Sequence, residues 1–173
     1  MLLTAAGSDC AVLLGQWARQ AGAEAVYGIH RSPVHAQRLA EMGIVPIAQH
    51  DTAAVNAAAA QAEVVYDATG GSLAETILSV MPETGTFVCY GLLSGQIFRQ
   101  QRPLPRVAWF HIRNYLDALN AEAWQAEFRR IWPKLRASQC SDVTLYPLSE
   151  WQRAVGNYRE AGRTGKPMLS MDN

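Results

Sequence analysis

The sequence predicts an α/β fold in which a doubly wound parallel sheet is covered by helices on both faces. Short apolar segments alternate with segments of helical periodicity from Leu2 to Tyr90. The interiors of the apolar segments are almost continuously hydrophobic, which is typical of strands buried on both sides. Glycines and other small residues separate the two kinds of segment. This alternation favours βαβ units over an all-helical or all-β domain.

The chain begins with a strand, a turn and a helix. Leu2–Thr4 is an apolar strand, and a turn of small residues over 5–11 leads into the helix. Apolar side chains then recur at helical spacing, at Val12, Leu13, Trp17 and Ala21. A helix start presents unpaired N–H groups and the positive end of the helix dipole, so a pyrophosphate can bind there.

The turn has the form of the dinucleotide fingerprint GxGxxG without meeting it strictly. When the pattern is laid over residues 6–11, its three glycine places hold Ala6, Ser8 and Ala11. Small side chains at these places let a phosphate approach the backbone. An ordinary strand-to-helix turn of an α/β protein is the alternative. The candidate pyrophosphate-binding residues are Ala6, Gly7, Ser8, Asp9, Cys10 and Ala11.

The following segments continue the alternation. We expect strands over 24–30, 45–48, 63–67 and 86–90. We expect helices over 34–42, over 52–62 with Asp51 or Thr52 as the cap, and over 72–81. Later in the chain, a helix is expected over 121–135 that Pro133 kinks or ends. Ser149–Gln152 has the form of a capping box before a helix that runs to Gly162, and a last strand is expected over 166–171.

Composition and charge exclude several classes of protein. The chain has 173 residues, 49% hydrophobic and 17% charged, which suits one soluble domain with a real core. Its formal net charge of +0 argues against nucleic acid or acidic membranes as partners. The sequence has neither a membrane-spanning run nor a signal peptide, so we expect a cytoplasmic protein.

The sequence offers no pattern for other chemistry. Its four histidines are not spaced as metal ligands with Cys or Asp, so no metal site is expected. Cys10, Cys89 and Cys140 are far apart and odd in number, and we interpret them as reduced thiols. The chain has no GxSxG elbow and no Walker lysine, which argues against hydrolase and P-loop functions.

The end of the second strand bears on the choice of cofactor. NAD-binding domains place an acidic residue about 20 positions after the glycines, whereas a basic residue there suits the additional phosphate of NADP. Here the place holds His30, Arg31 and Ser32. Arg31 offers a forked donor that matches phosphate, although a solvated surface arginine is the alternative. The sequence therefore favours NADPH.

A resemblance to a known family covers almost the whole chain. It is carried, in order, by TAAGSDCAVLLGQWARQAGA, GIHRSPVHAQRLAEMG, VVYDATGG, TFVCYGLLSG and YREAGRTGKPMLSM. These segments resemble the cofactor-binding half of medium-chain dehydrogenase/reductases, in particular the zinc-independent quinone oxidoreductase and enoyl thioester reductase branch. The resemblance implies a Rossmann-type fold, bound NADPH, and hydride transfer to a quinone or an α,β-unsaturated carbonyl compound. Asp9 and Ala11 depart from the family pattern, and a carboxylate repels pyrophosphate unless it turns away or caps the helix.

The resemblance also indicates further site residues. The stretch after the fifth strand lies near the nicotinamide in the family, and a later aromatic segment passes along the cofactor. For Phe110, core packing is the alternative. Beyond the turn, the candidate cofactor-binding residues are His30, Arg31, Ser32, Thr69, Tyr90, Gly91, Leu92, Leu93, Ser94, Phe110 and Ile112.

The family places a GroES-like catalytic domain before its cofactor-binding domain. The resemblance implies that residues 1–173 are one NADPH-binding domain whose last segment, about 145–173, packs on that catalytic domain. No residue here inherits the family's proton-donating tyrosine, so no catalytic residue is assigned and the chain alone is expected to be inactive. We expect apolar surface around Trp151, Tyr158 and Met168–Leu169 to favour a homodimer. The alternative function is a non-catalytic nucleotide-sensing or protein-interaction module.

Overall fold

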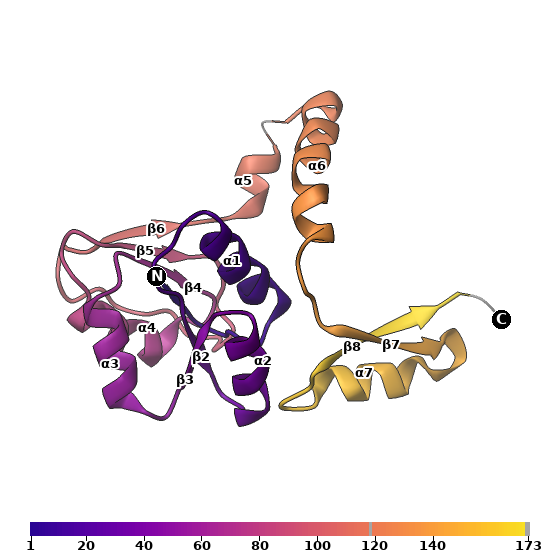
Figure 1. Ribbon diagram of the computed structural model, residues 1–173, viewed down its shortest axis with the longest axis horizontal. Coiled ribbons are helices and arrows are strands. Elements are labelled where there is room, and N and C mark those ends of the chain that lie inside the picture. Colours follow the sequence, from indigo (N-terminus) through magenta and orange to yellow (C-terminus); the bar gives the residue numbers. More distant parts are fainter. Residues whose placement is uncertain (118, 172–173) are drawn as a thin grey trace.

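A six-stranded parallel sheet forms the centre of the protein. The computed structural model describes residues 1–117 and 119–171. The strands lie in the order β3-β2-β1-β4-β5-β6, and each pairs with its neighbours in parallel. This arrangement confirms the doubly wound Rossmann-type fold (Figure 1). The strands are β1 (Leu2–Leu3), β2 (Tyr27–His30), β3 (Val45–Ala48), β4 (Val64–Asp67), β5 (Thr86–Cys89) and β6 (Arg106–Trp109).

Helices cover both faces of this sheet. Successive side chains of a strand point to opposite faces, so Leu2 packs in the core under α3 and α4 while Leu3 packs in the core under α1 and α2. Ser8 caps α1 and Asp51 caps α3 through their side-chain oxygens. The helices are α1 (Asp9–Gln20), the short 3₁₀ helix η1 (Pro33–His35), α2 (Ala36–Glu41), α3 (Thr52–Ala60) and α4 (Gly71–Val80).

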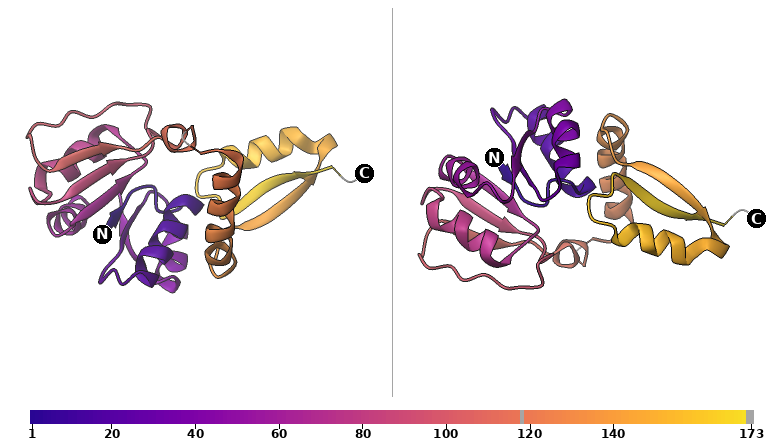
Figure 2. Two further views of the ribbon diagram at one scale, coloured as in Figure 1. Left: turned by 90° about the horizontal axis from the view of Figure 1, so that it is seen from above. Right: turned by 90° about the horizontal axis from the view of Figure 1, so that it is seen from below.

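The rest of the chain lies beside the sheet rather than within it. Helices α5 (Ile112–Leu116) and α6 (Ala121–Arg136) lead to a parallel pair of strands, β7 (Asp142–Pro147) and β8 (Gly165–Ser170). Between these strands lie the 3₁₀ helix η2 (Leu148–Glu150) and α7 (Trp151–Arg159). We call residues 1–117 the sheet unit and residues 138–171 the C-terminal unit, and Figures 1 and 2 show them as separate bodies.

The helix expected over 121–135 is present as α6, whereas the capping box expected at Ser149 is not formed. Helix α6 continues past Pro133 to Arg136, and the carbonyl of Pro133 accepts a hydrogen bond from the Ala137 N–H. None of its residues is buried, so the local adjustment that proline requires disturbs no packing. Ser149 does not form a capping box, because it lies within η2 and Glu150 takes the cap position without a side-chain hydrogen bond.

The protein also contains two strands that the sequence did not predict, β6 and β7. Cys10, Cys89 and Cys140 are all free, and only Cys89 is buried. Over the ranges 1–117 and 119–171, no helix combines the length and apolar character needed to cross a membrane.

Candidate functional site

The turn between β1 and α1 is shaped by one unusual backbone angle. Ala5 has a φ of 48°, and it is the one non-glycine residue with positive φ in the described part of the chain. Glycine adopts such a backbone angle freely, and at Ala5 it makes the turn after β1 tight. The fingerprint places at Ala6, Ser8 and Ala11 stay a prediction. The side chains of Ala6 and Ala11 are fully buried in the core, so only the backbone at these two residues could approach a phosphate.

Gly7 has no room for a side chain. An added Cβ would lie 2.6 Å from the His35 ring, so the imidazole packs directly on the glycine backbone. Ser8 follows as the cap of α1, and its Oγ accepts from the Ala11 N–H at 3.4 Å. Gly7 and Ser8 thus provide the close backbone approach and the helix start that a pyrophosphate requires.

Asp9 turns away from this helix start toward the C-terminal unit. Its Oδ1 accepts from the backbone N–H of Ser141 at 2.8 Å and from the Ser141 hydroxyl at 2.6 Å. Arg38 lies 3.5 Å from Oδ1, and Lys166 lies 3.7 Å from Oδ2. Burial alone raises the pKa of Asp9, but the Ser141 hydrogen bonds and the two cations outweigh it and lower that pKa below its usual value.

Basic side chains gather beside the loop that follows β2. His30 is only 6% exposed, and its Nδ1 is buried with no hydrogen-bond partner among the described residues. Burial lowers the pKa of His35, and so do the positive charges of His30, Arg38 and Arg163 nearby. Arg31 is exposed. We call these five residues the basic cluster.

Arg163 reaches this cluster from the loop between α7 and β8. The preceding Gly162 rests on Ser32, where an added Cβ would lie 2.8 Å from the serine Oγ. The Arg163 guanidinium stacks 4.8 Å from the centre of the Tyr158 ring and donates to the Gly165 carbonyl. Its Nε is buried and unpartnered within the described chain. Sequence reasoning missed His35, Arg38 and Arg163, and no local motif marks Arg163.

A hydrogen-bond network joins the carboxyl ends of β1 and β4. Thr4 Oγ1 donates to Asp67 Oδ1 at 2.7 Å and accepts from the Ala68 N–H at 2.9 Å. The Asp67 carboxylate, fully buried, also accepts from the N–H groups of Thr69 and Gly70. This network fixes the loop that opens α4 and carries Thr69, at the edge of the sheet where open α/β folds bind ligands.

The predicted nicotinamide-binding segment lies across that loop. Leu93 N–H donates to the Ala68 carbonyl at 2.9 Å and Ser94 N–H to the Thr69 carbonyl at 3.0 Å. The Tyr90 hydroxyl is buried beside Cys10, and burial, together with Cys10 and Asp67, raises the pKa of Tyr90. Tyr90 and Cys10 therefore bring the end of β5 close to the start of α1, whereas Leu93 is 72% exposed.

Phe110 and Ile112 lie farther along the same edge. Phe110 N–H donates to the Cys89 carbonyl at 2.8 Å, which continues the pairing of β5 with β6. Both side chains are exposed, so the alternative of core packing for Phe110 is wrong. Among the residues described, the Phe110 ring stacks on no other ring, and neither side chain hydrogen-bonds to the turn or the basic cluster.

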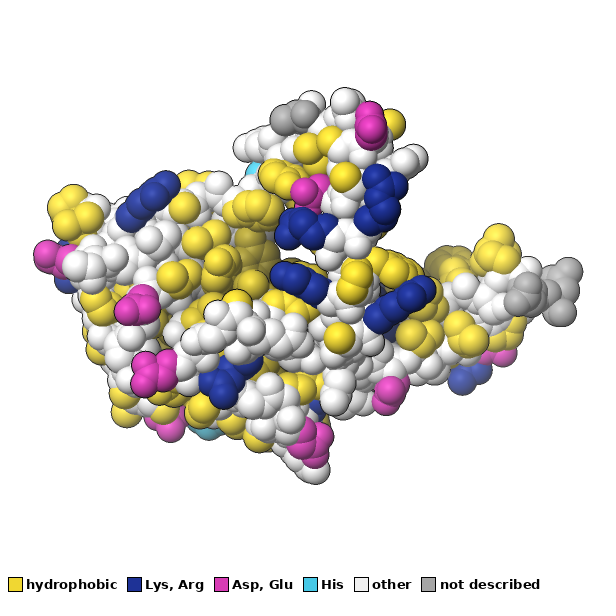
Figure 3. All heavy atoms as spheres, turned by 45° about the horizontal axis from the view of Figure 1, so that its top comes forward, with side chains coloured by type: hydrophobic (Ala, Val, Ile, Leu, Met, Phe, Trp, Pro, Cys, Tyr) yellow, Lys and Arg dark blue, Asp and Glu magenta, His cyan; other side chains and the backbone are white. Residues whose placement is uncertain are grey.

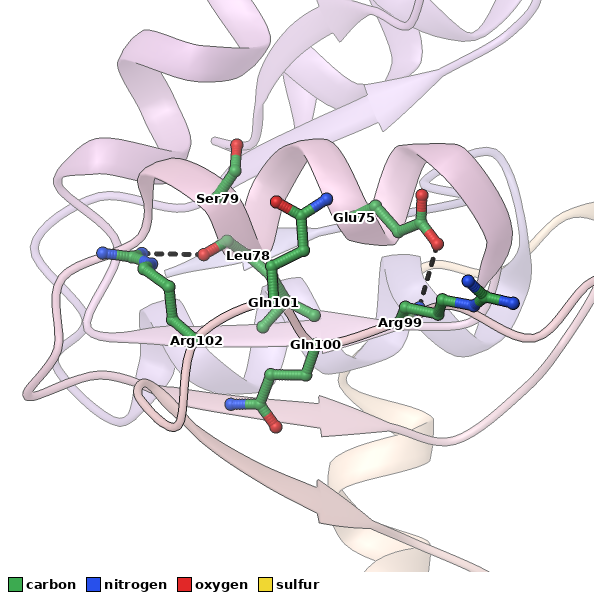
Figure 4. Close-up of a pocket in the computed structure, with 7 residues that line it drawn as sticks. All are labelled: Glu75, Leu78, Ser79, Arg99, Gln100, Gln101 and Arg102. Carbon is green, nitrogen blue, oxygen red and sulfur yellow. Dashed lines mark hydrogen bonds between the residues drawn. The ribbon is translucent and has the colours of Figure 1, made fainter.

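Two surface hollows lie away from the turn, the basic cluster and the segment over 90–94. One, of about 130 Å³, lies between the starts of α3 and α4 and is lined by Gln49, Thr52, Val55, Ser72, Leu73 and Thr76. The other, of about 80 Å³, lies between α4 and residues 99–102 (Figure 4). There Arg102 donates to the carbonyls of Leu78 and Met81 and so closes the end of α4. Neither hollow is lined by a predicted site residue.

Comparison with known families decides the relationship. Residues 11–133, more than half of the chain, match the model of the family described as "Zinc-binding dehydrogenase". The chain belongs to this family. In medium-chain dehydrogenase/reductases, this zinc-binding dehydrogenase model describes the C-terminal domain. No curated protein matches the sequence.

Solved structures share the fold of this zinc-binding dehydrogenase domain. A Bacillus thuringiensis protein assigned as an NADPH:quinone reductase matches with a TM-score of 0.83 and 23% identity, over 98% of this chain and 55% of its own. A quinone oxidoreductase of Pseudomonas syringae pv. tomato DC3000 gives 0.75 and 21%, over 97% and 55%. A mitochondrial 2-enoyl thioester reductase heterodimer of Candida tropicalis gives 0.67 and 17%, over 92% and 51%. The chain spans about half the length of these proteins.

The residues present fit a dinucleotide better than they fit the metal in the family's name. The α1 start and the buried His30 Nδ1, which has no hydrogen-bond partner among the described residues, provide polar groups for a phosphate-rich ligand. Within the described residues of this zinc-binding dehydrogenase domain, no three His, Cys, Asp or Glu side chains gather as a metal site. No step of a mechanism is therefore assigned to zinc.

Proposed function

We propose that this chain is the NADPH-binding domain of an oxidoreductase that reduces a quinone or an α,β-unsaturated carbonyl compound, such as an enoyl thioester. The basic cluster carries the proposal. It occupies the end of β2, where an NAD-specific domain holds an acidic residue. Three permanently charged side chains, Arg31, Arg38 and Arg163, contribute to it, and only Arg38 is paired with the Asp9 carboxylate. That surplus of positive charge suits the additional phosphate of NADPH.

Each group of residues has a proposed role in binding the cofactor. Gly7, Ser8 and the first N–H groups of α1 hold the pyrophosphate. Arg31 and Arg163 bind the additional phosphate, and residues 90–94 flank the nicotinamide, which supplies the hydride when the cofactor is bound. No residue of this chain is proposed as the proton donor.

The exposed apolar surface supports a proposal about partners. Hydrophobic side chains gather around the hollow between the sheet unit and α6 (Figure 3). Trp151, Tyr158, Met168 and Leu169 are also exposed. We propose that residues 145–173 pack on a further domain of the full-length oxidoreductase, and that without it the chain forms a homodimer in the cytoplasm.

Titration with NADPH tests the central proposal. Saturable enhancement or a shift of NADPH fluorescence is expected when the chain is added, with weaker binding of NADH. A variant with Gly7→Val places a side chain where the His35 ring lies and should lose binding of both cofactors. The absence of any saturable change with the folded wild-type chain contradicts the proposal.

One observation favours a second candidate function. The proposed nicotinamide neighbours Leu92 and Leu93 are open to solvent, whereas hydride transfer requires a site closed to water. A non-catalytic nucleotide-sensing or protein-interaction module has no such requirement. NADPH binding without turnover, in a full-length protein that contains this chain, would favour the module.

A further inference from the structure

Polar contacts join the C-terminal unit to the sheet unit. Of the described residues, those that form the two apolar cores end at Val107. Along α1, Trp17 Nε1 donates to Ser138 Oγ at 2.9 Å, and the Gln16 side chain exchanges two 2.9 Å hydrogen bonds with the Gln139 backbone. The position of the C-terminal unit therefore depends on individual hydrogen bonds and ion pairs rather than on a shared core.

Asp9 makes more of these contacts than any other described residue of the sheet unit. Its carboxylate binds the backbone and hydroxyl of Ser141, pairs with Arg38 on α2, and pairs with Lys166 on β8. Arg38 also donates to the Ser141 hydroxyl at 2.9 Å. One side chain thus connects α1, α2, the residue before β7, and β8. The two cations also neutralise its charge, so it presents no bare carboxylate to a neighbouring phosphate.

This connection leads directly to the basic cluster. Lys166 follows Arg163 by three residues, on the strand that the α7–β8 loop enters. When Asp9 holds Lys166 and Ser141, the loop is kept against the β2 loop, with Gly162 on Ser32. Arg163 is the only cationic member of the cluster that comes from outside the sheet unit. Its place in the cluster depends on the seating of the C-terminal unit.

We propose that Asp9 is a positioning residue, which seats the C-terminal unit so that Arg163 completes the phosphate end of the cofactor site. The contacts by which Asp9 holds the C-terminal unit against the sheet unit, which we call the seating, do not require any ligand. The effect on cofactor choice rests on the proposed function above. This role explains why Asp9 departs from the fingerprint, because its carboxylate links the turn before α1 to the C-terminal unit that carries Arg163.

Hydrogen exchange of backbone amides in the ligand-free chain, followed by NMR, tests the seating. In Asp9→Ala the Ser141 amide loses its acceptor, and its exchange should accelerate about tenfold or more, with a smaller increase over 160–165. Asp9→Asn keeps an acceptor oxygen but loses both ion pairs, so its effect should be intermediate. Asp51→Ala, which removes the carboxylate cap of α3, is the matched control and should leave Ser141 unchanged. Unchanged exchange at Ser141 in Asp9→Ala overturns the proposal.

Cofactor affinities then test the effect on Arg163. Asp9→Ala should lower the affinity for NADPH about tenfold while changing the affinity for NADH much less. Arg163→Ala should have the same effect. The double variant should be no weaker than Arg163→Ala alone, because both act through one contact. Additive losses, or tighter NADPH binding by Asp9→Ala, overturn the positioning role. If the wild type binds neither cofactor, the proposed function fails and the effect on cofactor choice fails with it, while the exchange experiment still decides the seating.

Discussion

Arg31 is the residue on which the choice of cofactor most directly depends. It is exposed in a loop without an acidic side chain, and no ion pair within the described residues competes for its guanidinium. Arg31→Ala should weaken the binding of NADPH by about 1.5–3 kcal/mol, which is the contribution of a charged hydrogen bond. It should weaken the binding of NADH much less. Fluorescence titration measures both dissociation constants, with Arg99→Ala, another exposed arginine, as the control. Equal losses for the two cofactors contradict the role of Arg31.

His35 should make stability depend on pH. Burial and neighbouring cations lower its pKa in the folded chain below the ordinary 6.5. As the pH falls through 6.5, the unfolded chain takes up a proton that the folded chain resists, so stability falls. Urea unfolding at pH 7.5 and 5.5 should show a larger loss for the wild type than for His35→Gln. The lowered pKa of Asp9 affects the free energy of unfolding only near and below its ordinary value of 3.8, which lies outside the range from pH 7.5 to 5.5. An equal loss in both proteins shows that His35 is not responsible.

Among the elements, β1 and β4 are joined at their carboxyl ends by a buried hydroxyl as well as by their backbone pairing. Thr4 Oγ1 pairs with both the Asp67 carboxylate and the Ala68 N–H. Thr4→Val keeps the shape of the side chain but leaves the Ala68 N–H without an acceptor and removes one of the three donors to the Asp67 carboxylate. The unpaired N–H should lower the free energy of unfolding by about 1–3 kcal/mol. Urea denaturation measures the change, and Thr84→Val on an exposed turn is the control. A loss no greater than that of the control means that the network adds nothing to stability.

The elements that sequence reasoning found are those with buried apolar faces. Leu2, Val65 and Phe87 are fully buried in strands, and their segments were located within a few residues. Strand β6 escaped notice because it lies at the sheet edge, where Arg106 and Trp109 are exposed. Strand β7 is almost wholly exposed and pairs with a strand that begins after α7. Patterns of hydrophobicity carry little information about such strands.

For the whole molecule, we expect binding without catalysis. The 173-residue chain leaves Leu92 and Leu93 beside the proposed nicotinamide site in water, so a substrate there is not enclosed. Oxidation of NADPH, followed with simple quinones and enoyl thioesters, should not exceed the rate without protein, although NADPH binds. Robust turnover by the pure chain would falsify this expectation and make Tyr90 and His111 the first residues to mutate.

The site could be anticipated only where its residues are local in sequence. The glycine turn and Arg31 follow directly after strands, so a local pattern marks both. The positive φ of Ala5 is not visible in the sequence, because alanine rarely adopts a backbone angle usual for glycine. Arg163 and Ser141 lie far along the chain from the residues they approach. Their place at the site depends on how the C-terminal unit sits on α1, which no local pattern expresses.

The polar junction between the two units has a mechanical consequence. Strand β1, at the N-terminus, is hydrogen-bonded between β2 and β4 in the middle of the sheet, whereas β8, near the C-terminus, belongs to the outlying pair. A pulling force applied to the two ends loads the sheet through β1 and the junction through Ser138, Gln139 and Ser141. The junction holds by a few hydrogen bonds and ion pairs that can break one after another along α1, while the sheet must break its strand pairings together with two apolar cores. Under load the C-terminal unit therefore peels away first and leaves the sheet unit intact.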